Sequence, residues 1–256
     1  MLRIIISPAK KMNVADDFPI ETTVPRFLER TEALKSYLQS QDYATLKGIW
    51  KCNDQIAAQN VERLDGMQLT GRVTPAVIAY EGIQYQSMAP AVMEEKHLDY
   101  LREHLYILSG FYGILRAFDG VVPYRLEMQA KLDWMYDGTN VTSLYDYWGD
   151  RLYHVLAEVQ TERVTIINLA SREYSKAIEP WLEPGVSMVN CIFGELEEGK
   201  VKVKATAAKM ARGAMVRYMA EHQVTEVDQL KAFSEMGYQY QEQLSDHETL
   251  VFVRNV

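Results

Sequence analysis

Short runs of apolar, often β-branched residues alternate along the chain with longer stretches in which apolar residues recur every three or four positions. The short runs predict buried strands, and the longer stretches predict amphipathic helices. The clearest predicted strands are 2–7, 75–80, 105–109 and 164–169, with weaker candidates at 186–193, 200–205 and 249–253. The predicted helices are 26–38, 43–50, 54–64, 91–103, 146–159 and 206–222.

This order of elements predicts an α/β fold, because strands that alternate with helices build a mixed sheet with a parallel portion. Proline and glycine are scattered rather than clustered, and the chain has neither an internal repeat nor a low-complexity linker. We therefore predict a single domain over residues 1–256, with a mixed sheet flanked by helices.

Charge restricts the partners that the chain can bind. The 256 residues carry a formal net charge of −8, with 48% hydrophobic and 24% charged residues, which is ordinary for a globular protein. Because an acidic chain repels nucleic acid at long range, any binding of DNA would need a local cluster of cations.

Signals for membranes, secretion and metal binding are missing from the sequence. No stretch approaches the ~18 uninterrupted apolar residues of a membrane span, and the apolar run at 2–6 is too short for a signal peptide. The two cysteines, Cys52 and Cys191, are far apart, which fits a reducing compartment. Neither cysteines nor histidines show the spacing of a metal site. We expect a cytoplasmic protein with no membrane contact, no metal and no cofactor.

Three of the predicted strands end in the same way, with a small residue, a serine and then a cation. A serine there can cap a helix, whose free N–H groups attract anions, and ligands of open α/β sheets bind outside the carboxyl ends of strands. If the three strands are parallel neighbours, their loops form one cleft for an anion such as a phosphate or nucleotide group. Alternatively, each serine is only a cap and each glycine only a turn. The candidate residues are Ser7 and Lys10 at the first strand, Ser109, Gly110, Tyr112 and Arg116 at the second, and Asn168, Ser171 and Lys176 at the third.

Residues 123–128 are dense in rings and charges. In an extended segment Tyr124, Leu126 and Met128 face one way, and Arg125 and Glu127 face the other. The two charged residues are either a surface ion pair, which would contribute little, or a buried pair that faces a ligand.

The strongest departure from the acidic average is the stretch 200–217, which holds six cations and no acid. On a helix three of them share one side, together with Gly213. A glycine inside a helix costs about 1 kcal/mol relative to alanine, so its presence suggests the close approach of a ligand or another backbone. A phosphate-facing surface and a solvated amphipathic helix both remain open. The cations are Lys200, Lys202, Lys204, Lys209, Arg212 and Arg217.

Two short predicted helices at 43–64 flank a tight connection, Lys51-Cys52-Asn53. Helix–hairpin–helix units hold a DNA phosphate with the N–H groups of such a hairpin. The usual hairpin glycines are absent, and the pattern alone favours a plain αα-hairpin.

Taken in order, these segments resemble the motifs of the YaaA peroxide-stress family, over nearly the whole chain. The resemblance implies a role in peroxide stress, in which free iron and hence oxidative damage are limited. It also implies an α/β fold with a positively charged cleft, binding of double-stranded or distorted DNA, and a helix–hairpin–helix element at 43–64. The motifs are Ile6-Ser7-Pro8-Ala9-Lys10, Leu108-Ser109-Gly110-Phe111-Tyr112-Gly113-Ile114-Leu115-Arg116, Pro123-Tyr124-Arg125-Leu126-Glu127-Met128, Tyr147-Trp148-Gly149-Asp150, Ile167-Asn168-Leu169-Ala170-Ser171-Arg172-Glu173-Tyr174 and Lys209-Met210-Ala211-Arg212-Gly213-Ala214-Met215.

Two functions therefore compete at this stage. The first is a stress protein that binds DNA, or a phosphate-bearing small ligand, through Lys204, Lys209, Arg212 and Arg217 and the strand-end residues. The second is an enzyme acting on a nucleotide or a damaged nucleobase, with Glu127 or Glu173 as acid–base and Arg125 or Lys209 stabilising an anion. Direct iron handling ranks last, because no cluster of suitable ligands is visible.

Overall fold

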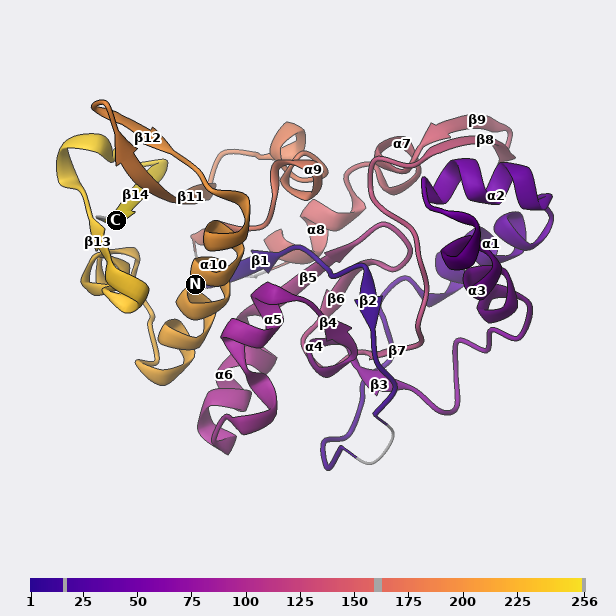
Figure 1. The fold of residues 1–256 in the computed structure, drawn as a ribbon, viewed down its shortest axis with the longest axis horizontal. Coiled ribbons are helices and arrows are strands. Elements are labelled where there is room, and N and C mark those ends of the chain that lie inside the picture. The colour runs from indigo at the N-terminus through magenta and orange to yellow at the C-terminus, as the bar shows by residue number, and fades with distance from the viewer. Residues whose placement is uncertain (16–17, 159–162, 255–256) are drawn as a thin grey trace.

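A mixed β-sheet forms the centre of the computed structural model, which describes residues 1–15, 18–158 and 163–254 (Figure 1). Five strands are parallel, and the edge strands β6, β12 and β13 are antiparallel. The order is β13 (Tyr238–Tyr240), β14 (Thr249–Arg254), β11 (Val186–Glu197), β10 (Val164–Leu169), β1 (Leu2–Ile6), β5 (Leu105–Ser109) and β6 (Gly113–Arg116), and β12 (Lys200–Lys202) pairs with β11.

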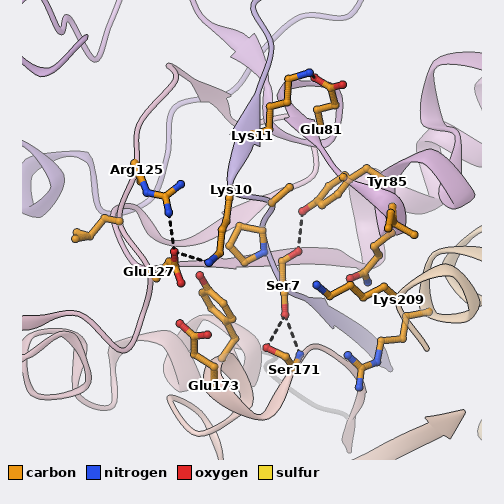
Figure 2. A pocket seen from close by; sticks show the side chains of 18 of the residues that line it. Ser7, Lys10, Lys11, Glu81, Tyr85, Arg125, Glu127, Ser171, Glu173 and Lys209 are labelled. Carbon is orange, nitrogen blue, oxygen red and sulfur yellow. Dashed lines mark hydrogen bonds and ion pairs between the residues drawn. The ribbon is translucent and has the colours of Figure 1, made fainter. Parts of the chain in front are cut away.

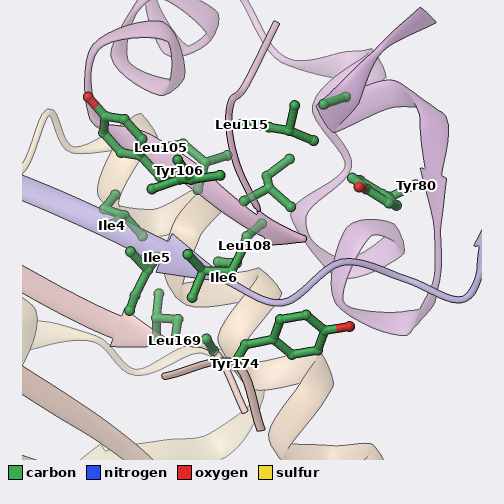
Figure 3. Packing of buried hydrophobic residues seen from close by; sticks show 14 of the residues in the cluster. Ile4, Ile5, Ile6, Tyr80, Leu105, Tyr106, Leu108, Leu115, Leu169 and Tyr174 are labelled. Atoms are coloured by element: carbon green, nitrogen blue, oxygen red, sulfur yellow. The ribbon is translucent and has the colours of Figure 1, made fainter. Parts of the chain in front are cut away.

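Strand β1 lies between β10 and β5, and every one of its side chains is buried. Parallel strands that are covered on both faces have continuous apolar sequences, which explains the run Leu2–Ile6. Ile4, Ile5 and Ile6 belong to one hydrophobic cluster with side chains of β5 and with Leu169 at the end of β10 (Figure 3). The core therefore fixes the carboxyl ends of β1 and β10 side by side.

Helices flank this sheet, and the longest one carries part of the cation-rich stretch. Helix α10 packs against α5, α6 and β11. At the opposite end of the molecule from the C-terminal strands, α1–α3 lie near the β8–β9 hairpin (Figure 1). The helices are α1 (Leu28–Gln39), α2 (Tyr43–Trp50), α3 (Asp54–Asp65), α4 (Ala76–Ala79), α5 (Ile83–Met88), α6 (Glu95–His104), α7 (Leu144–Trp148), α8 (Arg151–Ala157), α9 (Arg172–Ser175) and α10 (Ala205–Glu221).

Short strand pairs and short 3₁₀ helices complete the fold. None of the helices in the described ranges is long and apolar enough to cross a membrane. The pairs are β2 (Lys11–Met12) with β4 (Tyr80–Glu81), β3 (Thr74–Pro75) with β7 (Gly120–Val121), and β8 (Lys131–Tyr136) with β9 (Thr139–Ser143). The 3₁₀ turns are Pro90–Val92, Glu179–Trp181, Val227–Ala232, Glu235–Gly237 and Glu242–Leu244.

The mixed α/β fold predicted from the sequence is confirmed, and so are most of its elements. The strand predicted at 75–80 is wrong, because these residues form the end of β3, the helical turn α4 and the start of β4. A short apolar run does not distinguish a buried strand from a buried helix. Here the N–H groups of Ala76 and Val77 donate to the carbonyls of Asp119 and Ala117, outside any long ladder.

Two further boundaries differ from the prediction. The helix predicted at 146–159 is two helices, α7 and α8, separated at Gly149, whose φ of 55° a helix does not allow. Its predicted end at residue 159 lies outside the described residues. The strand predicted at 200–205 is short, because β12 ends at Lys202 and α10 begins at Ala205.

Candidate functional site

A pocket of about 400 Å³ opens at the carboxyl ends of β1 and β10 (Figure 2). Because Ile6 and Leu169 are partners in the parallel ladder, the residues that follow them leave the sheet together. The backbone N–H of Ser171 donates to Ser7 Oγ at 2.8 Å, and the two hydroxyl oxygens are 3.2 Å apart. The structure thus brings the first and third predicted loops into one site. Its walls come from residues 7–11, 81–85, 124–127, 171, 173 and 174 and from two residues of α10.

The second predicted loop is folded differently. Strand β5 is indeed a parallel neighbour of β1, but a tight turn leads at once into antiparallel β6. Ser109 is fully buried, where its Oγ accepts the N–H groups of Phe111 and Tyr112 and lies 2.6 Å from the Tyr124 hydroxyl. The loop therefore supports the pocket wall through Tyr124 without facing the pocket.

Other residues of this loop also lie outside the pocket lining. At Gly110 a Cβ would lie 2.7 Å from the Leu126 carbonyl oxygen. The glycine therefore allows close approach of the segment 124–127, which lines the pocket, and not of a ligand. The buried Tyr112 hydroxyl accepts the N–H of Val122 at 3.1 Å. Arg116 is exposed and borders a separate hollow beside Asp119.

Two candidates of the third strand end are likewise displaced from the pocket. Asn168 is buried, donates to Asn190 Oδ1 at 2.8 Å and accepts the N–H of Ala170 at 3.0 Å. Its amide is thus used within the fold. Lys176 is exposed at the end of α9 and does not line the pocket.

One side of the pocket carries two cations, Lys209 and Arg212, from adjacent turns of α10. Among the described residues neither forms an ion pair, and the buried Nε of Arg212 has no hydrogen-bond partner. Burial lowers the pKa of the Arg212 guanidinium, although such a group stays protonated at neutral pH. A half-buried guanidinium with a buried, unpartnered Nε is costly for the fold and suits an anionic ligand.

The remaining cations of the stretch 200–217 that were named as site candidates are paired elsewhere. Lys204 Nζ lies 2.5 Å from Glu197, which also binds Lys202 at 2.7 Å, and Arg217 pairs with Glu221 at 2.7 Å. Hydrogen bonds from the two lysines lower the pKa of Glu197 to about 2. Neither Lys204 nor Arg217 lines the pocket.

The other side of the pocket carries an ion-paired carboxylate, Glu127 (Figure 2). It lies 2.9 Å from Lys10 Nζ and 3.4 Å from Arg125, and the side chains of Arg125 and Glu127 are only 12% and 21% exposed. The alternation predicted for 124–128 is confirmed, since Tyr124, Leu126 and Met128 are buried. Of the two alternatives, the pair is therefore largely buried and faces the pocket.

Glu173 is a second carboxyl group in the same wall, and it differs from Glu127. It accepts the N–H of Gln129 at 3.3 Å and forms no salt bridge among the described residues. Burial raises the pKa of Glu173, and the negative charge of nearby Glu127 raises it further. Within the same ranges, no group of three or more His, Cys, Asp and Glu side chains is placed to hold a metal ion.

The third wall of the pocket, residues 81–85, was not predicted from the sequence. Tyr85 donates its hydroxyl to the Ser7 carbonyl at 2.9 Å, and Glu81 pairs with Lys11 at 2.7 Å. Gly213 explains why α5 lies here, since a Cβ at that position would be 2.0 Å from the Gln84 carbonyl oxygen. The helical glycine signalled a close approach, but its partner depends on the tertiary fold.

The helices predicted at 43–64 are confirmed as α2 and α3, joined by a turn in which Lys51 has a φ of 45°. Asn53 caps α3 by accepting the N–H of Ile56 at 2.9 Å, and Asp54 binds Lys47 at 2.7 Å. The hairpin touches the pocket wall through Arg125, whose Nε donates to the Trp50 carbonyl at 3.4 Å.

Comparison with known proteins gives one consistent result. The family model described as "Peroxide stress protein YaaA" matches residues 2–244. A UPF0246 protein of Desulfitobacterium hafniense is 51% identical over 253 residues, which cover 99% of this chain and 98% of that protein. A UPF0246 protein of Ligilactobacillus salivarius is 49% identical over 255 residues, covering 99% and 100%. The chain belongs to the YaaA family of peroxide stress proteins.

Proposed function

We propose that this protein acts in the cytoplasmic response to peroxide by binding distorted double-stranded DNA at the pocket, and so helps to limit iron-dependent oxidative damage. Family membership supports the role in peroxide stress. The observation that carries the proposal of DNA binding is the pair Lys209 and Arg212, which line the pocket without an anionic partner among the described residues.

A phosphate is the ligand that best fits this pair. Arginine presents a planar fork of donors that matches phosphate oxygens, and lysine adds a point charge. The other cations of the pocket are already paired, Lys10 and Arg125 with Glu127, and Lys11 with Glu81. Lys209 and Arg212 are thus the cations of this pocket that remain available to an anion, on a chain whose net charge is −8.

The size of the pocket favours distorted DNA over a regular duplex. A volume of about 400 Å³ is that of a site for one small ligand, which commonly has about 300–1,000 Å³. A stacked duplex cannot enter such a space, whereas a nucleotide that has left the stack can. The proposed effect on iron damage follows indirectly, through protection of the bound DNA.

The α2–α3 hairpin is the weaker of the two candidate DNA contacts. Asn53 already occupies the N–H of Ile56, and Asp54 adds a negative charge where a phosphate would bind. In the titration below, we expect Lys51→Ala to change the affinity for DNA less than about twofold.

The test is a fluorescence anisotropy titration of duplex and bubble DNA at low and near-physiological salt. We expect salt-sensitive binding that favours the bubble, and loss of at least about tenfold in affinity for Lys209→Ala/Arg212→Ala, with a smaller salt slope. The matched control is Lys202→Ala/Lys204→Ala, which removes the same charge from lysines already bound to Glu197. Equal losses of affinity in both double variants would mean that only the net charge of the protein matters for binding. That result would contradict the proposal.

A second candidate function is an enzyme that acts on a nucleotide or a damaged nucleobase in the same pocket. The observation in its favour is Glu173, a carboxyl group whose pKa is raised by burial beside the ion-paired Glu127. Binding of a phosphate alone does not require a carboxyl group with a raised pKa.

A further inference from the structure

Two of the three carboxyl groups that line the pocket, Glu127 and Glu173, lie across it from its two unpaired cations. In Figure 2, Glu127 and Glu173 lie on one side and Lys209 on the other, with Ser7 and Ser171 between them. A phosphate bound by Lys209 and Arg212 would therefore be kept away from the negative charge of the carboxylates. The part of a nucleotide that reaches the carboxyl groups is then the sugar and base.

The environments of these two carboxyl groups are unequal. Glu127 forms ion pairs with Lys10 at 2.9 Å and with Arg125 at 3.4 Å. Glu173 has no salt-bridge partner among the described residues, and burial raises its pKa. A carboxyl group paired with two cations beside a carboxyl group that is buried without a cation is the arrangement that glycoside hydrolysis uses.

We propose that this pocket hydrolyses the N-glycosidic bond of a nucleotide anchored by its phosphate, with Glu173 as general acid and Glu127 as the stabilising carboxylate. The proposal rests on the phosphate site proposed above for Lys209 and Arg212 and deepens it. Its substrate is a deoxynucleotide unit that has left the stack of a distorted duplex.

The reaction needs no oxidant, reductant or other co-reactant besides water. The bond between C1′ and the base nitrogen breaks, and its electron pair leaves with the base, which takes the proton of Glu173. The Glu127 carboxylate stabilises the positive charge that develops on the sugar. A water oxygen then bonds to C1′ and gives its proton to the Glu173 carboxylate, which restores the acid. The products are the free base and an abasic sugar phosphate.

Aromatic side chains complete a site for a base. Tyr85, Tyr124 and Tyr174 line the pocket, and base–aromatic stacking is tolerant of sequence. The Tyr85 hydroxyl is held by the Ser7 carbonyl, and the Tyr124 hydroxyl lies 2.8 Å from that of Tyr80. Because the Tyr85 and Tyr124 hydroxyls are already bonded, the small part of these rings that is exposed is chiefly apolar.

The experiment measures release of free base by chromatography from bubble DNA that contains a single 8-oxoguanine, a single uracil or only ordinary bases. Binding of the same DNA is measured in parallel by anisotropy. We expect base release by the full-length protein from at least one probe, and a loss of about 100-fold or more in Glu173→Gln. Binding by this variant should change less than about twofold, because glutamine still accepts the N–H of Gln129. The exposed Glu183→Gln is the matched control.

A pH profile separates an acid from a merely structural group. Release should fall as the pH rises through the raised pKa of Glu173, up to tenfold per pH unit, and Glu173→Gln should lack this limb. Tight binding without release of base from any probe would overturn the inference and leave the proposed DNA binding intact. Failure to bind as well as to release would overturn both.

Discussion

The cation-rich stretch 200–217 divides into two parts that differ in what their side chains meet. Lys202, Lys204 and Arg217 bind carboxylates at 2.5–2.7 Å, whereas Lys209 and Arg212 line the pocket without an ion pair in the described ranges. The sequence shows a single block of positive charge. The structure leaves only part of that charge available for a ligand.

The difference follows from the geometry of a β-hairpin. Glu195 and Glu197 precede the block in sequence, and β12 folds back antiparallel onto the end of β11. This pairing places Glu195 opposite Lys202 and Glu197 opposite Lys200. Glu197, which precedes the block in sequence, thus neutralises Lys202 and Lys204 in space. Arg217 is neutralised within α10 by Glu221.

The largest expected effect concerns the contact that holds α10 against the pocket wall. Gly213→Ala would place a Cβ 2.0 Å from the Gln84 carbonyl oxygen, so we expect α5 to be displaced and the free energy of unfolding to fall by about 3 kcal/mol or more. Chemical denaturation measures this change. Gly48→Ala in α2, where a Cβ meets nothing within 4 Å, should instead stabilise by about 0.5–1 kcal/mol. If both substitutions stabilise, the close approach at Gly213 does not exist.

An intermediate effect is expected at the buried guanidinium itself. Arg212→Met should weaken DNA binding about tenfold and, at the same time, raise the free energy of unfolding by about 1 kcal/mol, because a half-buried charge with an unpartnered Nε is replaced by an apolar side chain. Lys209→Met, at an exposed position, should weaken binding without stabilising the fold. Destabilisation by Arg212→Met would show that the guanidinium has a partner within the fold.

The smallest expected effect concerns the cations that are paired with carboxylates. Glu197→Gln removes the carboxylate shared by Lys202 and Lys204, so binding of any DNA at low salt should rise about two- to threefold and its salt slope should steepen. Glu235→Gln makes the same change of net charge at another exposed position. An equal rise in both variants would mean that overall charge, and not release of the two lysines, is responsible.

The sequence predicted the sheet well because its central strands are continuous apolar runs with few alternatives. It also predicted which way the side chains of 124–128 point, since period-two alternation fixes the faces of an extended segment. It could not show that Ser109 is buried, because the immediate turn into β6 is what removes that serine from the pocket. Nor could it place Tyr85, whose position depends on the packing of α5 against Gly213.

The central place of β1 in the sheet affects how the chain is made. Both of its neighbours, β5 and β10, are synthesised after it, and the second is complete only when Leu169 has been added. Until then a growing chain carries four apolar residues of β1 with at least one strand edge unpaired, a state that favours aggregation and slow, non-local folding. Strand β1, which positions Ser7 in the pocket of the folded protein, therefore remains incompletely paired during most of synthesis. We expect this strand to depend on chaperones or on the ribosome to keep it from aggregating.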